Sequence, residues 1–268
     1  MQTFRSSDGL AIAYDAAGEG EPVVLVHGLG LSRRRWDPVR AALLEAGYRV
    51  ARYDLRGFGD SELPDEPYPF DALVDDFRGA VAAFGLDDTP FHLVGHSVGG
   101  MIAQRFAIES PAAVRTLTLC STTAHCGRRA SAFARALSHL ARHGYDAAVN
   151  DPAIRAAAED VLRTAFDTPP PLAMFRRGLE EPNPAQAFGW LATAEFSTKD
   201  ELGAIRCPAL VLHGTADPVI PVSNGRALHG GLDGARYVEI DGAGHHIPVE
   251  HGERLATEVL ALLASRTR

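Results

Sequence analysis

The chain has 268 residues, of which 46% are hydrophobic and 22% are charged, and its formal net charge is −8. This composition is ordinary for a globular protein and fits one large α/β domain or two small ones. The acidic balance argues against nucleic-acid binding, which requires a basic surface. No apolar run approaches the roughly 20 residues needed to span a bilayer.

The start of the sequence and its cysteines indicate a cellular compartment. The first residues lack the charged-then-apolar pattern of a secretory signal. Three cysteines, Cys120, Cys126 and Cys207, are an odd number without metal-ligand spacing. We therefore expect a cytoplasmic protein with reduced thiols.

Strand-like and helix-like segments alternate along the first 121 residues. A polar–apolar alternation over 3–16, around a Ser-Asp-Gly turn, predicts an edge hairpin. Helical periodicity predicts three helices, at 36–46, 71–84 and 101–110. Apolar runs predict four strands, at 23–26, 48–53, 91–94 and 114–119.

The character of the sequence changes between residues 122 and 199, where strand-like runs are absent. Strands resume at 209–212 and 235–240, and a final amphipathic helix is expected over 251–264. The pattern predicts an α/β fold with a doubly wound, mostly parallel sheet. Its core covers 1–121 and 200–268, interrupted by a helical insertion at 122–199. Within this insertion we expect helices at 130–143, 153–166 and 185–196.

A Gly-x-Ser-x-Gly motif at 95–99 stands between a predicted strand and a predicted helix. Such a corner strains the backbone at Ser97, and Gly95 and Gly99 remove side chains that would clash there. The turn exposes the hydroxyl and points the first amides of the helix at the same place, as a nucleophile and an oxyanion require. We predict that Ser97 is a nucleophile, with a plain turn as the alternative.

A serine hydroxyl requires a base within hydrogen-bond reach, and several of the 11 histidines compete for that role. His245 follows a Gly-Ala-Gly turn directly after a predicted strand, so it can reach the strand ends where ligands bind in such sheets. His246 is the adjacent alternative. His96 is fixed beside the serine, which points it away into a structural hydrogen bond. His245 is therefore the predicted base.

The base requires a group that holds its tautomer, and Asp217 is the predicted orienting acid. It follows the 209–212 strand in a turn with a proline. The rival location, after the 114–119 strand, carries no carboxylate. Asp241 and Glu250 lie nearer the base in sequence but are interpreted as a turn former and a helix-start carboxylate.

An oxyanion hole requires two backbone amides. The turn at the serine supplies the Val98 N–H, and we expect the second from the Leu29 N–H in the His-Gly-Leu-Gly loop at 27–30. Losing one such donor typically reduces the rate by ~10²–10³.

Five motifs together resemble the α/β-hydrolase superfamily, in which serine, acid and histidine follow in this chain order. The resemblance implies that 122–199 is a helical cap that lines the substrate pocket. The sequence is most similar to carboxylesterases, enol-lactone hydrolases and cofactor-free haloperoxidase-like esterases. The motifs are His-Gly-Leu-Gly at 27–30, Asp-Leu-Arg-Gly-Phe-Gly-Asp-Ser at 54–61, Gly-His-Ser-Val-Gly-Gly at 95–100, His-Gly-Thr-Ala-Asp at 213–217 and Gly-Ala-Gly-His at 242–245.

The expected activity is hydrolysis of a carboxylic ester or lactone through an acyl-enzyme, with no cofactor and no metal. One alternative is hydrolysis of a carbon–carbon bond in a dienoate or β-diketone, although family members with that activity often carry Asn where His96 stands. Another is a ligand-binding receptor on a hydrolase scaffold. Similar epoxide hydrolases and dehalogenases use an aspartate as the nucleophile, so a serine at position 97 argues against these two activities.

The expected partner is a small ester or lactone, with no nucleic acid and no membrane, and the oligomeric state stays open. The arginines at 33–35 are interpreted as solvated, with steering of an anionic substrate as the alternative. Arg56 is expected to tie loops together near the strand ends. Most apolar and aromatic residues of the 122–199 insertion are interpreted as packing it onto the core, with lining of an apolar pocket as the alternative. The candidate substrate contacts are His27, Gly28, Met101, Phe133, Leu137, Trp190 and His246.

Overall fold

The computed structural model describes residues 1–163 and 182–265, and the chain forms two compact units. The first contains Met1–Glu62, Leu73–Ala124 and the chain from Thr198 onward. The second contains Leu63–Ala72 and His125–Ser197. The sequence pattern gave no indication that 63–72 would group with a segment more than 50 residues away.

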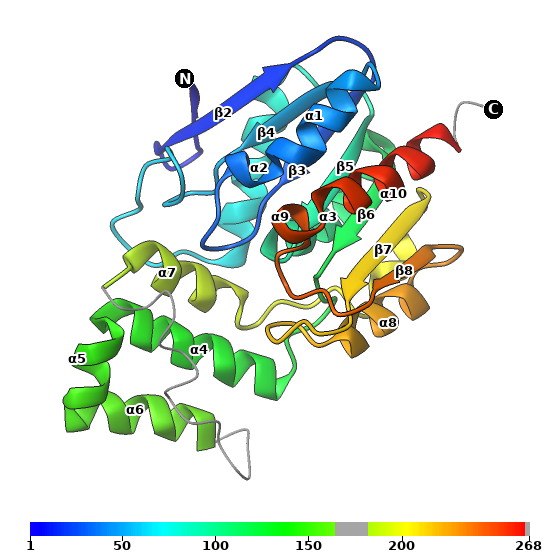
Figure 1. Cartoon of the computed structure of the whole chain (residues 1–268). Coiled ribbons are helices and arrows are strands. Elements are labelled where there is room, and N and C mark those ends of the chain that lie inside the picture. The colour runs from blue at the N-terminus through cyan, green and yellow to red at the C-terminus, as the bar shows by residue number, and fades with distance from the viewer. Residues whose placement is uncertain (164–181, 266–268) are drawn as a thin grey trace. The chain divides into compact units, whose positions relative to one another are not determined.

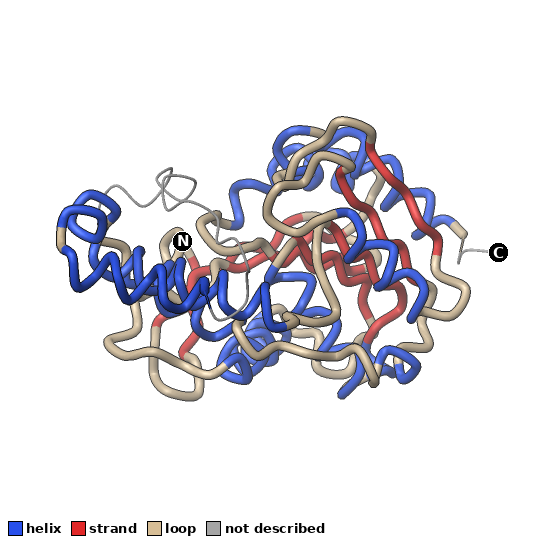
Figure 2. The backbone as a smooth tube through the Cα atoms, turned by 90° about the horizontal axis from the view of Figure 1, so that it is seen from below, coloured by secondary structure: helices blue, strands red, loops and turns tan. Residues whose placement is uncertain are grey.

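The first unit contains an eight-stranded sheet. Its strands are β1 (Gln2–Arg5), β2 (Ala11–Ala17), β3 (Pro22–Val26), β4 (Arg49–Tyr53), β5 (Phe91–His96), β6 (Val114–Cys120), β7 (Ala209–Gly214) and β8 (Arg236–Ile240). Their order is β1-β2-β4-β3-β5-β6-β7-β8, with only the β1–β2 and β2–β4 pairs antiparallel. The doubly wound, mostly parallel sheet and the N-terminal hairpin are therefore confirmed, and Figure 2 shows the twist of the strands.

Helices cover both faces of this sheet (Figure 1). The helices of the first unit are α1 (Asp37–Glu45), α3 (Val98–Glu109), α8 (Val222–Gly231), α9 (Ile247–Glu250), α10 (Gly252–Ala264) and all but the first three residues of α2 (Phe70–Ala83). Buried apolar side chains of α1, α9 and α10 pack with inward residues of β3 and β7 in one core cluster. On the other face, Phe77 of α2 and Phe106 of α3 pack edge to face, with ring centroids 4.8 Å apart. Burial on both faces explains the continuous apolar runs of the central strands.

The direction of winding reverses at β3, which places the functional edge of the sheet. β3 pairs with β4 on one side and with β5 on the other, both in parallel. Ligands of open α/β sheets bind at the carboxyl ends of strands at such a reversal. The loop after β3 and the turn after β5 therefore begin side by side.

The second unit is mainly helical in its described residues. Its helices are α4 (Arg128–His143), α5 (Tyr145–Asn150), α6 (Pro152–Arg163) and α7 (Pro184–Thr193). The Asn183 side chain accepts the Gln186 N–H and so caps α7. The rings of Phe70 and Phe196 lie 4.8 Å apart and join the two segments of this unit. The end of the helix expected over 153–166 lies outside the described residues.

Three short helices were not anticipated from the sequence, namely α5, α8 and α9. Several other elements differ by a few residues from the expected bounds. The helix expected from residue 101 begins at Val98, and a 3₁₀ turn, η1 (Arg33–Trp36), precedes α1. Among the described residues, no helix is long and apolar enough to cross a membrane.

Candidate active site

Ser97 occupies a strained corner between β5 and α3. Its backbone adopts φ 54° and ψ −121°, and a positive φ at a non-glycine residue costs about 1–3 kcal/mol. A Cβ at Gly95 would lie 2.4 Å from the Gly99 carbonyl oxygen, and one at Gly99 would lie 2.2 Å from the Val26 carbonyl oxygen. The two glycines thus permit the close approach that the motif predicted.

Two hydrogen bonds, one to the last residue of β6 and one from a side chain just after it, hold this corner. The Ser97 N–H donates to the Cys120 carbonyl oxygen at 2.9 Å, and the Thr122 hydroxyl donates to the Ser97 carbonyl oxygen at 2.7 Å. Thr122 is 1% exposed. Sequence reasoning examined this strand end only for a carboxylate and so missed the hydroxyl that it supplies.

Ser97, His245 and Asp217 form one hydrogen-bonded chain. His245 Nε2 lies 3.0 Å from Ser97 Oγ, and His245 Nδ1 lies 2.7 Å from Asp217 Oδ2. Each of the three residues is 7% exposed. With a proton on Nδ1 donated to the carboxylate, Nε2 can accept the hydroxyl proton. The structure therefore brings together the three side chains that the sequence singled out.

The carboxyl group of Asp217 is held in place on both oxygens. Its Oδ1 accepts the Val219 and Ile220 N–H groups, each at 2.9 Å. His213 Nε2 lies 3.5 Å from Oδ2 and donates to the Ile220 carbonyl oxygen at 2.8 Å. Burial alone would raise the pKa of the Asp217 carboxyl, but hydrogen bonding from His213 and His245 holds that pKa well below its usual range. The carboxylate therefore stays charged beside His245.

Two backbone amides are available near the serine. Val98 is the first residue of α3, and Leu29 lies half-buried in the loop after β3. Neither N–H donates to another described residue. A Cβ at Gly28 would lie 2.8 Å from Ser97 Cβ, so this loop touches the turn at the serine. These amides are the donors expected for an oxyanion.

His27, a predicted substrate contact, has hydrogen bonds to the backbone on both ring nitrogens. Its ring is 1% exposed, its Nε2 accepts the Leu55 N–H at 3.0 Å, and its Nδ1 donates to the Gly28 carbonyl oxygen at 2.8 Å. Burial lowers the pKa of His27, which keeps the ring neutral. These contacts favour support of the loop over contact with a substrate.

The remaining candidate contacts lie in different parts of the chain. Met101 is buried in α3, and its N–H donates to the Ser97 carbonyl oxygen at 3.2 Å. His246 is exposed and precedes α9. The other three belong to the second unit, where Leu137 is buried and Phe133 and Trp190 are half-buried.

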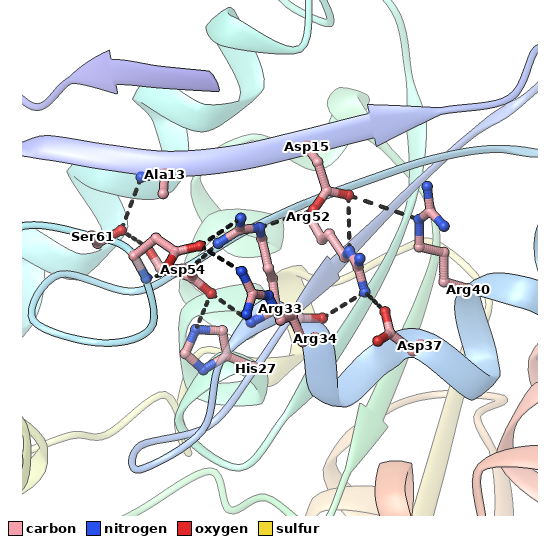
Figure 3. A network of polar contacts seen from close by, with 11 residues as sticks. Ala13, Asp15, His27, Arg33, Arg34, Asp37, Arg40, Arg52, Asp54 and Ser61 are labelled. Carbon is pink, nitrogen blue, oxygen red and sulfur yellow. Dashed lines mark hydrogen bonds and ion pairs between the residues drawn. The ribbon is translucent and has the colours of Figure 1, made fainter. Parts of the chain in front are cut away.

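Arg33 is not solvated, and the interpretation of the whole 33–35 run as surface arginines was wrong at this position. Arg33 is 6% exposed because η1 turns its side chain inward, toward three carboxylates, of which Figure 3 labels Asp15 and Asp54. The guanidinium binds Asp54, and it contacts Asp15 and Asp60 at 2.9 Å each. Burial alone would lower the pKa of Arg33, but these carboxylates raise it. Arg34, by contrast, is exposed and pairs with Asp60.

Arg56 forms a second buried ion pair near the strand ends. It is 1% exposed and donates to both oxygens of Asp76, at 2.7 and 2.8 Å, and to Asp8. Asp8 lies in the N-terminal hairpin turn and Asp76 in α2. Arg56 therefore ties these segments together, as the sequence indicated.

Residues 21–252 match the family model of the alpha/beta hydrolase fold, and the chain belongs to this family. A Variovorax paradoxus protein, provisionally named a carbamate hydrolase, is 32% identical over 95% of this chain and 97% of that protein. A thermophilic esterase from Thermogutta terrifontis is 27% identical, with a TM-score of 0.73 and 98% of both chains covered. The enol-lactonase from Burkholderia xenovorans is 26% identical, with a TM-score of 0.73, over 98% of this chain and all of that chain.

Proposed function

We propose that this protein is a serine hydrolase that cleaves a carboxylic ester or a lactone through an acyl-enzyme. The observation that carries the proposal is the hydrogen-bonded chain from Asp217 through His245 to Ser97, with contacts of 2.7 and 3.0 Å. The Val98 and Leu29 N–H groups provide a second requirement of acyl transfer, hydrogen-bond donors for the oxyanion.

In the first half-reaction, Ser97 Oγ attacks the carbonyl carbon while His245 Nε2 takes the hydroxyl proton. The negative charge on the former carbonyl oxygen is stabilised by the Val98 and Leu29 N–H groups. The Asp217 carboxylate stabilises the imidazolium and holds its orientation. His245 then gives the proton to the leaving alkoxide oxygen, and the acyl group stays on Ser97.

In the second half-reaction, His245 removes a proton from water, which attacks the acyl carbon. The tetrahedral intermediate again places its oxyanion on the two amides. Collapse returns the proton to Ser97 Oγ and releases the carboxylic acid. A lactone follows the same steps, except that the leaving oxygen stays attached to the acyl group through its carbon chain, so the product is a single hydroxy acid.

The relatives support an oxygen ester as the substrate class. Both the esterase and the enol-lactonase extend over nearly the whole chain. Carbamate hydrolysis, the activity in the name of a further relative, also begins with attack on an acyl carbon. Met101 and His246 are proposed as substrate contacts because they lie close in sequence to Ser97 and His245.

The test is steady-state hydrolysis of p-nitrophenyl acetate, butyrate and octanoate by the wild type and Ser97→Ala. We expect the wild type to turn over and the variant to lose at least ~10³-fold in kcat. Ser121→Ala is the matched control, because Ser121 is a buried serine at the end of the neighbouring strand and also has a positive φ of 46°. Equal activity of wild type and Ser97→Ala, or an inactive wild type, contradicts the proposal.

A further inference from the structure

The residue before the serine, His96, makes a contact that the proposed mechanism does not use. It is the last residue of β5, and it is 1% exposed. Its Nε2 lies 2.8 Å from the backbone carbonyl oxygen of His245, which is 149 positions later in the chain. We propose that His96 is a positioning residue that holds the backbone of the base His245 in register with the nucleophile, an inference that rests on the proposed function.

The contact defines which nitrogen of His96 carries the proton. A carbonyl oxygen only accepts, so Nε2 must donate and the proton must be on Nε2. Nδ1 is buried and has no hydrogen-bond partner among the described residues. Burial lowers the pKa of His96 well below its usual range, and the neighbouring His245 lowers it further. His96 is therefore a neutral ring that donates through Nε2.

The second half of the argument concerns the loop that carries His245. This loop, 241–246, is held at its beginning by the turn that follows β7. The Ala216 N–H donates to the Ala243 carbonyl oxygen at 3.0 Å, and the Gly242 N–H donates to the Thr215 hydroxyl at 2.8 Å. These contacts place the beginning of the loop relative to Asp217. They do not connect it to the serine.

His96 supplies that connection. Because Ser97 follows it directly in the chain, the Nε2–H bond ties the His245 backbone to the strand from which the nucleophile projects. The rings of His96 and His245 also lie 5.0 Å apart. A neutral ring suits this place, since a second positive charge there would oppose formation of the His245 imidazolium. The 3.0 Å separation of His245 Nε2 from Ser97 Oγ is thus fixed through the backbone and through the side chains.

Three substitutions at position 96 separate this role from packing. His96→Gln keeps an N–H donor near the position of Nε2, His96→Asn places its amide near Nδ1, and His96→Met fills similar volume without a donor. Misplacement of a reacting group by about 1 Å costs ~10²-fold, so we expect His96→Met and His96→Asn to lower kcat by that order. We expect His96→Gln to recover most of the loss, and KM to change little in all three.

The matched control is His92, which is also 1% exposed and lies at the other end of β5. Its Nδ1 bonds the Thr116 hydroxyl at 2.9 Å, away from the site. We expect His92→Met to lower thermal stability as His96→Met does, without a comparable loss in kcat.

Inactivation by a fluorophosphonate gives a second readout, because it reports attack by Ser97 without requiring turnover. If the wild type reacts with neither an ester nor the fluorophosphonate, the proposed function fails and this inference falls with it. If the wild type reacts and His96→Met reacts at the same rate, only the inference is overturned. Equal rates for His96→Asn and His96→Gln overturn it as well.

A nitrogen-15 NMR spectrum of the wild type tests the donor directly and does not depend on the folding of any variant. We expect the His96 signal of a neutral ring with the proton on Nε2. A proton on Nδ1 would leave Nε2 unable to donate to the His245 carbonyl and would overturn the inference.

Discussion

Two aspartates, Asp54 after β4 and Asp217 after β7, occupy equivalent places in the sheet but have different partners. Both follow a parallel strand, and both are buried, at 0% and 7% exposure. Asp54 binds the guanidinium of Arg33 and accepts the backbone N–H groups of Arg33 at 2.6 Å and Asp60 at 2.9 Å. Asp217 accepts hydrogen bonds from two backbone N–H groups and from the imidazole of His245.

The difference lies in whether the partner can exchange its proton. A guanidinium stays charged at every working pH, so the Arg33–Asp54 pair is a permanent connection. An imidazole gains and loses a proton near neutral pH, and the second nitrogen of His245 faces Ser97. The partner therefore distinguishes a structural carboxylate, Asp54, from the one for which we propose a chemical role, Asp217.

The largest effect is expected from Asp217→Asn. The amide keeps the shape but cannot stabilise the imidazolium or enforce its tautomer, so we expect kcat to fall by ~10⁴-fold. Asn can still accept the Val219 and Ile220 N–H groups, but it loses the charge that His213 and His245 stabilise, so the midpoint of thermal unfolding should also fall. Asp54→Asn should lower stability as well, but with a much smaller loss in kcat. Equal kcat losses in the two variants would remove the distinction.

The second largest effect is expected from Arg33→Met, measured by urea unfolding. Removing one partner leaves the Asp54 carboxylate buried without its cation, which typically costs about 3–5 kcal/mol. Adding Asp54→Asn to this variant should recover part of the loss, because the amide is neutral. A loss below about 1 kcal/mol for Arg33→Met would show that this is no more than a surface-type ion pair.

Much of this arrangement could be predicted from the sequence, for reasons that are local. Ser97, Asp217 and His245 each follow an apolar strand pattern and a turn, so their places at one edge of a parallel sheet follow from topology. The partners that support them are not local. Thr122 reaches the serine through the pairing of β5 with β6, which no short pattern encodes.

Arg33 shows a different limit. Three consecutive arginines have the composition of a solvated surface, and only the 3₁₀ turn η1 directs the first of them inward. Helix α8 was missed because it contains three glycines, which disfavour a helix. Helix α9 was missed because four residues are too few to show helical periodicity. The site was thus more predictable than its supporting network.

The pH dependence of stability provides a smaller test. Folding lowers the pKa of Asp217 below the ordinary aspartate value of 3.8, so its contribution to stability is present above pH 3.8 and is lost as the pH falls through the lower folded-state pKa. Asp217→Asn should remove this term, and the slope of unfolding free energy against pH below about pH 4 should be shallower by up to about 1.4 kcal/mol per pH unit. Identical slopes in urea titrations of the two proteins would contradict the shift.

The smallest effect concerns Cys126, a half-buried free cysteine. Burial raises the pKa of this thiol to about 11. Alkylation proceeds through the thiolate, so at pH 8 iodoacetamide should modify Cys126 about 100-fold more slowly than an exposed cysteine. Peptide mass spectrometry at timed intervals measures the rate, and modification at the rate of an exposed thiol would contradict the effect of burial.

The most direct test of the central claim is the location of a covalent adduct. The protein is treated with a fluorophosphonate, and its mass is measured intact and after digestion. We expect one adduct per chain, on Ser97, with none in Ser97→Ala and a greatly slowed reaction in His245→Ala. An adduct on another residue, or equal labelling of Ser97→Ala, would show that Ser97 is not the nucleophile and would contradict the account of the site.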